Sequence, residues 1–188
     1  MNSMNKNGEG VLKVAYISQV EYENASEEVK AQFEDQIRKH GRITNMKKTL
    51  LHSLPAFHTL MEWYPLEKEV EKFLGERATN FYCYAISTQN QCLICSTFFR
   101  KILVDLKIDF ETFEFTEEEN EIIEYGRYLV QDPTHIPAEL FDKLKNRYSE
   151  EQIVLLTAFG SMMIATNLIN TALQIDLDEV LTSYTKRG

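Results

Sequence analysis

Apolar side chains recur every three or four positions through most of the chain, which is the spacing that places them on one face of an α-helix. Between Val29 and Ile37 they recur every four residues. Ser26 precedes this stretch as a helix-capping residue, and Gly41 follows it as a C-terminal stop. The pattern therefore predicts a helix over residues 27–40.

Signals for helix starts and ends divide the rest of the chain. Pro55 and Pro65 each favour a break before them, because the residue before a proline avoids the helical conformation. Residues 116–119 and 149–152 have the spacing of a capping box at a helix start. Residues 14–20 are predicted as a short extended entry segment. Further helices are predicted over residues 46–53, 56–64, a short stretch after Pro65, 77–88, 92–106, 117–130, 137–146 and 150–173.

The predicted helix over residues 150–173 is apolar on nearly all sides. Such a helix lies either in the centre of the core or partly in a subunit interface. No low-complexity segment and no clear linker divides the chain. We therefore expect one all-α domain, a helical bundle over residues 14–188, preceded by a disordered lead-in over residues 1–13.

The composition is that of an ordinary soluble globule, with 44% hydrophobic and 26% charged residues. The 29 acidic and 20 basic side chains give a formal net charge of -9, which repels phosphate backbones and argues against nucleic-acid binding. No uninterrupted apolar run approaches the ~18 residues of a membrane helix, and residues 1–10 lack the apolar segment of a signal peptide. The sequence therefore predicts a cytoplasmic protein without a membrane partner.

Cys92 and Cys95 form a Cys-x-x-Cys pair at the predicted start of a helix. Side chains three residues apart share a helix face and can come within disulfide range, and the free N–H groups of a helix start stabilise a thiolate. A redox role therefore stands beside the simpler alternative that both thiols pack as small apolar side chains. In a reducing cytosol, three cysteines are not typical of a structural disulfide set.

Metal binding is a weaker alternative for this pair. A structural zinc site uses four Cys or His ligands, normally as two close pairs, and the extra cysteine nearby is Cys83 alone. The four histidines fall near predicted helix ends or in loops, where a surface or capping role is simpler: His40, His52, His58 and His135. We expect neither a metal nor a cofactor.

Three stretches, in this order, resemble the alkylhydroperoxidase D-like (AhpD-like) superfamily, also called the carboxymuconolactone decarboxylase family. HGRITNMKKTLLHSLPAF at residues 40–57 is similar to the stretch between the family's first two helices. QNQCLIC at residues 89–95 matches its Asn-x-Cys-x-x-Cys motif, and residues 132–175 resemble its final helix pair. The resemblance covers roughly residues 14–178 and implies an AhpD-like helical bundle that commonly assembles as dimers to hexamers.

The family's redox members carry Glu-x11-Cys-x-x-Cys-x3-His, in which the cysteines cycle between dithiol and disulfide while the Glu and the His relay protons. By position, the resemblance implies that Cys92 and Cys95 are the catalytic residues. The glutamate position falls on Asn80 and the histidine position on Phe99, neither of which titrates near neutral pH. The resemblance therefore implies thiol chemistry that is slow at pH 7.

Three functions stay open at this point. The first is reduction of a peroxide or disulfide by Cys92 and Cys95, with an external thiol electron donor to reset the pair. The second is a non-enzymatic oligomeric member with a binding or stress-response role, in which the cysteines only pack. The third is a relative of the decarboxylase branch, which ranks last because no cationic residues cluster in the motif. In each case we expect a homo-oligomer.

Overall fold

The structure of the protein is a computed structural model, which describes residues 15–109 and 112–185. These residues form helices and connecting segments, with no β-strand among them, which confirms the predicted all-α class. The elements are η1 (Tyr22–Asn24), α1 (Glu27–His40), α2 (Asn45–Leu50), α3 (Leu54–Met61), α4 (Trp63–Gln89), α5 (Leu93–Asp105), α6 (Glu117–Gln131), α7 (Ala138–Arg147), α8 (Glu150–Ala172) and η2 (Glu179–Tyr184).

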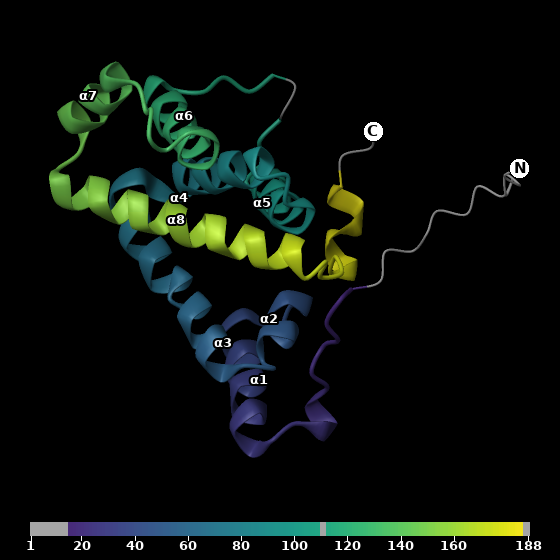
Figure 1. Ribbon diagram of the computed structural model, residues 1–188. Helices are drawn as coiled ribbons and strands as arrows, with labels where there is room; N and C mark the ends of the chain where they lie inside the picture. Colours follow the sequence, from purple (N-terminus) through teal and green to yellow (C-terminus); the bar gives the residue numbers. More distant parts are fainter. Residues whose placement is uncertain (1–14, 110–111, 186–188) are drawn as a thin grey trace, which may run out of the picture.

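The long helices α4 and α8 pack together at the centre of the fold (Figure 1). Helices α5 and α6 also pack on α4, and α7 joins α6 to the start of α8. The core between these five helices contains side chains with no exposed surface: Val70, Tyr82, Ile86, Ile122, Leu144, Leu156 and Phe159. The main core therefore depends on residues from 63 onward.

The first three helices form a smaller layer on the other side of α8 (Figure 1). Its buried side chains are Phe33, Leu50, Leu51, Phe57 and Leu60. Helix α8 contributes Met162, Ala165 and Ile169 to this second cluster. Helix α8 therefore packs against two apolar clusters, which explains why most of its circumference is apolar. Of the two positions considered from the sequence, the centre of the core and a subunit interface, this packing favours the centre of the core.

The predicted helix caps are all present. The Ser26 hydroxyl accepts a hydrogen bond from the Val29 N–H, and Gly41 ends α1 in the left-handed conformation with φ 73°. Both predicted capping boxes form, at Thr116 for α6 and at Ser149 for α8. These helix starts lie within one residue of the predicted positions because the caps depend only on neighbours in the sequence.

The predicted boundaries around the two prolines are wrong. Helix α3 starts at Leu54, because the Ser53 hydroxyl caps it and Pro55 lies in its first turn, where a missing N–H costs nothing. Helix α4 likewise starts at Trp63, with Pro65 in its first turn. Each proline thus lies inside the first turn of its helix, whereas the prediction placed it between two helices.

Helix α4 joins two predicted helices through a kink at Gly75, where φ is 77° and ψ is 161°. This conformation is open to glycine and strained for other residues. The segment before the kink leads from the small N-terminal layer, and the segment after it crosses the main core (Figure 1). Both segments contribute to the main core, with Val70 before the kink and Tyr82 after it fully buried.

Helix α8 is the one described helix with the length and apolar composition of a membrane span. The core helix of a soluble protein has the same properties. In α8, 33% of the most apolar window is buried within the protein.

The predicted lead-in over residues 1–13 lies outside the described residues. Residues 15–20 precede the first helix without regular structure, and the N–H groups of Tyr16 and Val20 donate to the carbonyls of Leu173 and Lys48.

Candidate functional site

The turn between α4 and α5 places Cys92 at the start of α5. Gln91 adopts the left-handed conformation with φ 56°, and the Cys92 N–H donates to the Ser87 carbonyl at 3.0 Å. Cys92 is then the N-cap residue of α5, and its sulfur accepts a hydrogen bond from the Cys95 N–H at 3.4 Å. Helix starts of this kind stabilise a thiolate through their free N–H groups.

The structure brings Cys92 and Cys95 into contact as free thiols, with their sulfurs 2.8 Å apart. They are only 1% and 4% exposed. The third cysteine, Cys83, is fully buried in α4 and has no place in this contact. Among the described residues, no group of three Cys, His, Asp or Glu side chains is arranged to hold a metal ion.

The two thiols differ in their tendency to ionise. The pKa of Cys92 is lowered, chiefly by its hydrogen bond with the Cys95 side chain, although burial opposes this effect. The pKa of Cys95 is raised well above its usual value, because burial disfavours its thiolate and its proton is held by Cys92. The first negative charge of the pair therefore resides on Cys92, where N–H groups of α5 surround it.

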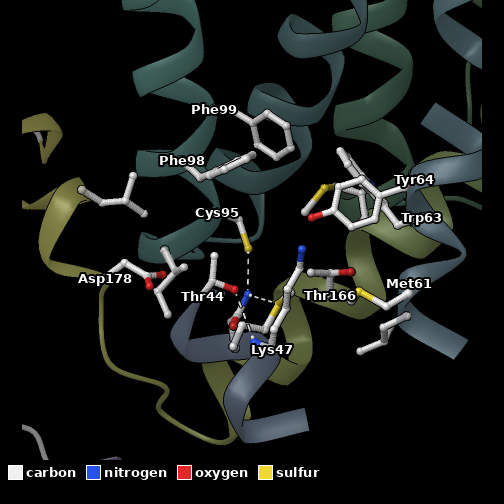
Figure 2. A pocket seen from close by; sticks show the side chains of 16 residues that line it. Thr44, Lys47, Met61, Trp63, Tyr64, Cys95, Phe98, Phe99, Thr166 and Asp178 are labelled. Atoms are coloured by element: carbon white, nitrogen blue, oxygen red, sulfur yellow. Dashed lines mark hydrogen bonds between the residues drawn. The ribbon is translucent and has the colours of Figure 1, made fainter. Parts of the chain in front are cut away.

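The Cys95 thiol lines a pocket of about 80 Å³ between the N-terminal layer and the main core (Figure 2). Cys92 is not among the residues that line it. Most of the wall is apolar or aromatic and comes from α3, α4, α5 and α8: Leu60, Met61, Trp63, Ile94, Phe98, Phe99 and Met163. A small molecule in this pocket meets Cys95 first.

Asn170 of α8 connects the pocket to the thiol. Its Nδ2 donates to the Cys95 sulfur at 3.1 Å and to the Met46 sulfur at 3.4 Å. Its Oδ1 is buried and has no hydrogen-bond partner, and the buried indole Nε1 of Trp63 also has none. Both residues line the pocket. A buried polar atom without a partner costs about 1–3 kcal/mol, so water or a bound molecule in the pocket that completed these two atoms would be favoured.

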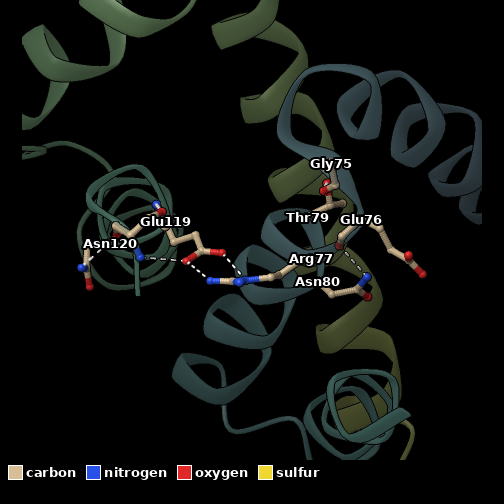
Figure 3. Close-up of polar contacts among 8 residues, drawn as sticks. Gly75, Glu76, Arg77, Thr79, Asn80, Glu119 and Asn120 are labelled. Carbon is tan, nitrogen blue, oxygen red and sulfur yellow. Dashed lines mark hydrogen bonds and ion pairs between the residues drawn. The ribbon is translucent and has the colours of Figure 1, made fainter. Parts of the chain in front are cut away.

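The two positions of the family's proton relay hold structural side chains. Asn80, 4% exposed, donates its amide to the Glu76 carbonyl at 2.8 Å, one helical turn earlier (Figure 3). Phe99 is 2% exposed, lines the pocket, and packs on Trp63 with a ring separation of 6.1 Å. Neither side chain can accept a proton from Cys95, as the sequence predicted.

Sequence reasoning missed Lys47, the cationic side chain in the pocket wall. It is 2% exposed and extends from α2 toward Tyr64, on the same pocket as Cys95 (Figure 2). Burial, and secondly the charge of Arg42, lowers its pKa to about 8. Its position three and four residues before Leu50 and Leu51, on the apolar face of a helix, was the available signal.

Solved structures of AhpD-like proteins have the same all-α fold. The debrominase Bmp8 in its apo form has a TM-score of 0.72 at 17% identity, covering 89% of this chain and 95% of that chain. An AhpD core protein from Ralstonia eutropha JMP134, described as peroxidase-related, has a TM-score of 0.69 at 12% identity, with coverage of 89% and 94%. A peroxidase-related protein from Silicibacter sp. TM1040 has a TM-score of 0.70 at 13% identity, with coverage of 92% and 97%.

No protein-family model and no curated protein matches the sequence. At identities this low, the likeness to solved structures establishes the AhpD-like fold and leaves the activity to be argued from the site.

Proposed function

We propose that the protein is a thiol-dependent reductase, in which Cys92 and Cys95 reduce a small substrate in the pocket and become a disulfide. The observation that carries this proposal is the contact between two reduced thiols, one of which lines a pocket with unpaired polar atoms. Cysteines that only pack, such as Cys83, need neither feature.

With a hydroperoxide R–O–O–H, the Cys95 thiolate attacks the terminal oxygen and the O–O bond breaks. The leaving alkoxide takes a proton to become the alcohol, and Cys95 becomes a sulfenic acid. The Cys92 thiolate then attacks that sulfur, the S–O bond breaks, and the hydroxide takes the second thiol proton to leave as water. The two thiols thus lose two electrons and two protons, and an external thiol donor returns them to the pair.

The pair supplies its own base in this proposal. Cys92 ionises first, and at a sulfur separation of 2.8 Å it can accept the proton of Cys95. The Asn170 amide then stabilises the negative charge on the Cys95 sulfur through its hydrogen bond of 3.1 Å. Since the two relay positions hold Asn80 and Phe99, the rate in this proposal follows the ionisation of the thiol pair, as expected from the sequence for a protein without the relay.

Reductive debromination is a second candidate, favoured by the aromatic pocket wall of Trp63, Tyr64, Phe98 and Phe99. The structurally similar Bmp8 is a debrominase, and a variant of it with a cysteine replaced by alanine forms a complex with 2,3,4-tribromopyrrole. The same two electrons would convert a C–Br bond to C–H, with bromide leaving and the 92–95 disulfide forming. Bromide release separates this activity from peroxide reduction.

The test treats the reduced protein, without oxygen, with tert-butyl hydroperoxide, 2-hydroxyethyl disulfide or 2,3,4-tribromopyrrole. We expect at least one of them to consume two thiols per molecule reduced, and peptide mapping to find a bridge between Cys92 and Cys95. Cys83→Ala should behave as the unmodified protein. No thiol loss with any substrate, or a bridge that includes Cys83, would favour the alternative in which the cysteines only pack.

We also propose a homo-oligomer. On α8, Val154 and Leu168 are 68% and 65% exposed, on a part of the helix that the two cores do not cover. A second subunit would cover these side chains. Sedimentation equilibrium should give a mass above the 21.9 kDa of one chain, and a monomer at micromolar concentration would remove this proposal.

A further inference from the structure

Lys47 is a buried cation whose described partners carry no charge. Its Nζ donates to the Gln36 Oε1 at 2.7 Å and lies 4.5 Å from the centre of the Tyr64 ring. No carboxylate of residues 15–109 or 112–185 lies within ion-pairing distance of it. An ammonium group has three donors, so a buried one with a single neutral acceptor has capacity left for a ligand.

The charged groups around Lys47 leave this side of the pocket positive. Arg42, before α2, and Lys39, on α1, both act to lower the Lys47 pKa, whereas Asp178, before η2, acts to raise it. Asp178 accepts a hydrogen bond from the Asn45 N–H at 3.0 Å. His40, stacked on Tyr64, is held toward its neutral form, mainly by burial.

Glu67 of α4 neither lines the pocket nor is among the charges that act on the Lys47 pKa. Burial, followed by the charge of Glu71, raises the pKa of Glu67 to about 8, so its carboxyl is mostly protonated at pH 7. Among the charged groups that act on Lys47, the two cations Arg42 and Lys39 outnumber the one carboxylate, Asp178. The surroundings of the Lys47 ammonium are therefore net positive.

We propose that Lys47 binds the negatively charged group of a small organic monoanion, whose apolar body fills the pocket beside Cys95. The wall has this mixed character: Lys47, Thr44 and Asp178 lie toward α2 and η2, and aromatic and aliphatic side chains form the rest. The indole N–H of Trp63, a residue of the same pocket wall, is a buried donor without a partner. The volume of about 80 Å³ fits a short aliphatic chain rather than a large ring system.

If the protein is the thiol reductase proposed above, the molecule that it reduces would carry a carboxylate or a similar anion. This statement of the substrate class rests on the proposed function. Binding itself needs no redox step, so it can be measured with molecules that Cys95 cannot reduce. Failure of anion binding and failure of thiol chemistry are therefore separate results.

Trp63 is the single tryptophan of the chain and lines the pocket, so its fluorescence reports occupation of this site. The reduced protein, kept in excess reductant at pH 7, is titrated with pentanoate, pentanamide and pentylammonium, which share one chain length. We expect pentanoate to change the Trp63 emission at concentrations roughly ten- to hundred-fold lower than pentanamide, because the carboxylate forms an ion pair with Lys47, whereas the neutral amide only accepts a hydrogen bond from it. Equal responses to the anion and the amide, or no response to pentanoate, would overturn the proposal.

The variant Lys47→Met keeps the length of the side chain and removes the charge. We expect its pentanoate affinity to fall roughly ten- to hundred-fold, to the level of pentanamide, with an unchanged far-UV CD spectrum. Lys48→Met, next on α2 and not part of the pocket wall, is the matched control and should bind pentanoate as before. Unchanged affinity in Lys47→Met would overturn the proposal, and if this variant does not fold, the comparison of the three probes on the unmodified protein still decides.

Discussion

Glu119 and Lys47 are both charged side chains that the fold buries, and their partners differ in kind. Glu119, 5% exposed, contacts Arg77 through two N–O distances of 2.7 and 2.8 Å, and accepts the Thr116 N–H at 2.8 Å (Figure 3). Lys47, 2% exposed, has one amide oxygen and one aromatic ring. The Glu119 carboxylate is fully paired within the protein. The Lys47 ammonium lines a pocket, and one of its three N–H donors has an acceptor.

This difference separates a structural charge from a charge available to a ligand. A buried ion whose hydrogen bonds are complete holds elements together, here α4 and the start of α6. A buried ion with incomplete bonds beside a reactive thiol destabilises the free protein and can recover that free energy when a ligand binds. Substitutions in the two regions should therefore have opposite effects on stability and different effects on activity.

The largest expected effect is that of Cys95→Ser on activity. Loss of the nucleophile should slow substrate-dependent oxidation of the pair by at least ~10³-fold, since removal of a catalytic nucleophile in general costs this much or more. The free energy of unfolding should change by less than about 1 kcal/mol, because serine has nearly the same shape. Stopped-flow thiol assays and urea unfolding measure the two quantities. A variant that keeps its rate would show that Cys95 does not attack first.

The next effect is that of Arg77→Met on stability. It leaves the Glu119 carboxylate buried with only the Thr116 N–H as a partner, which should lower the free energy of unfolding by about 2–4 kcal/mol. Arg38→Met is the matched control, because Arg38 pairs with Asp35 on an exposed face of α1 and should cost under ~1 kcal/mol. Urea unfolding at pH 7 compares them. Equal losses in both variants would mean that the Arg77 contact is no stronger than a surface pair.

Lys47→Met should change stability in the opposite direction. The Lys47 pKa falls on folding from its ordinary value to about 8, so the folded state releases a proton that the unfolded chain keeps. A lysine whose pKa is lowered on folding reduces the free energy of unfolding below pH 8. This reduction disappears as the pH rises toward the unfolded pKa of ~10.4. The methionine variant should therefore unfold at a free energy about 1–3 kcal/mol higher at pH 7, with the advantage shrinking by pH 10.

Urea unfolding of the unmodified protein and of Lys47→Met across this pH range tests the sign, because other titrating groups cancel in the difference. Lys48→Met should show no such pH-dependent difference. A destabilised Lys47→Met at pH 7 would indicate that the ammonium is already satisfied within the protein and would weaken the contrast with Glu119.

What the sequence predicted here depends on near neighbours. The caps at Ser26, Thr116 and Ser149 need only residues within three positions, and the contact between Cys92 and Cys95 is one helical turn. Such features are set by local geometry, so they were predictable without knowledge of the tertiary structure.

The pocket was not predictable in this way. Lys47, Trp63, Cys95 and Asn170 lie on four different helices, and only the tertiary arrangement of α2, α4, α5 and α8 brings them to one cavity. The absence of a cationic cluster near the cysteines in the sequence therefore gave an incomplete view of the site's charge. The starts of α3 and α4 were also missed, because a proline fits the first turn of a helix as well as the end of the preceding one.

The smallest expected effect concerns Gln91, whose left-handed conformation joins α4 to the cysteine helix. A residue with a Cβ is strained there and glycine is not, so Gln91→Gly should raise the free energy of unfolding by about 0.5–1 kcal/mol. Lys107→Gly, at φ 62° after α5, is the matched control and should gain a similar amount. If the turn only connects the helices, thiol oxidation rates will be equal in both variants and the unmodified protein. A slower rate in Gln91→Gly alone, at equal stability, would show that the rigid turn holds Cys92 at the helix start and contributes to the chemistry as well as to the fold.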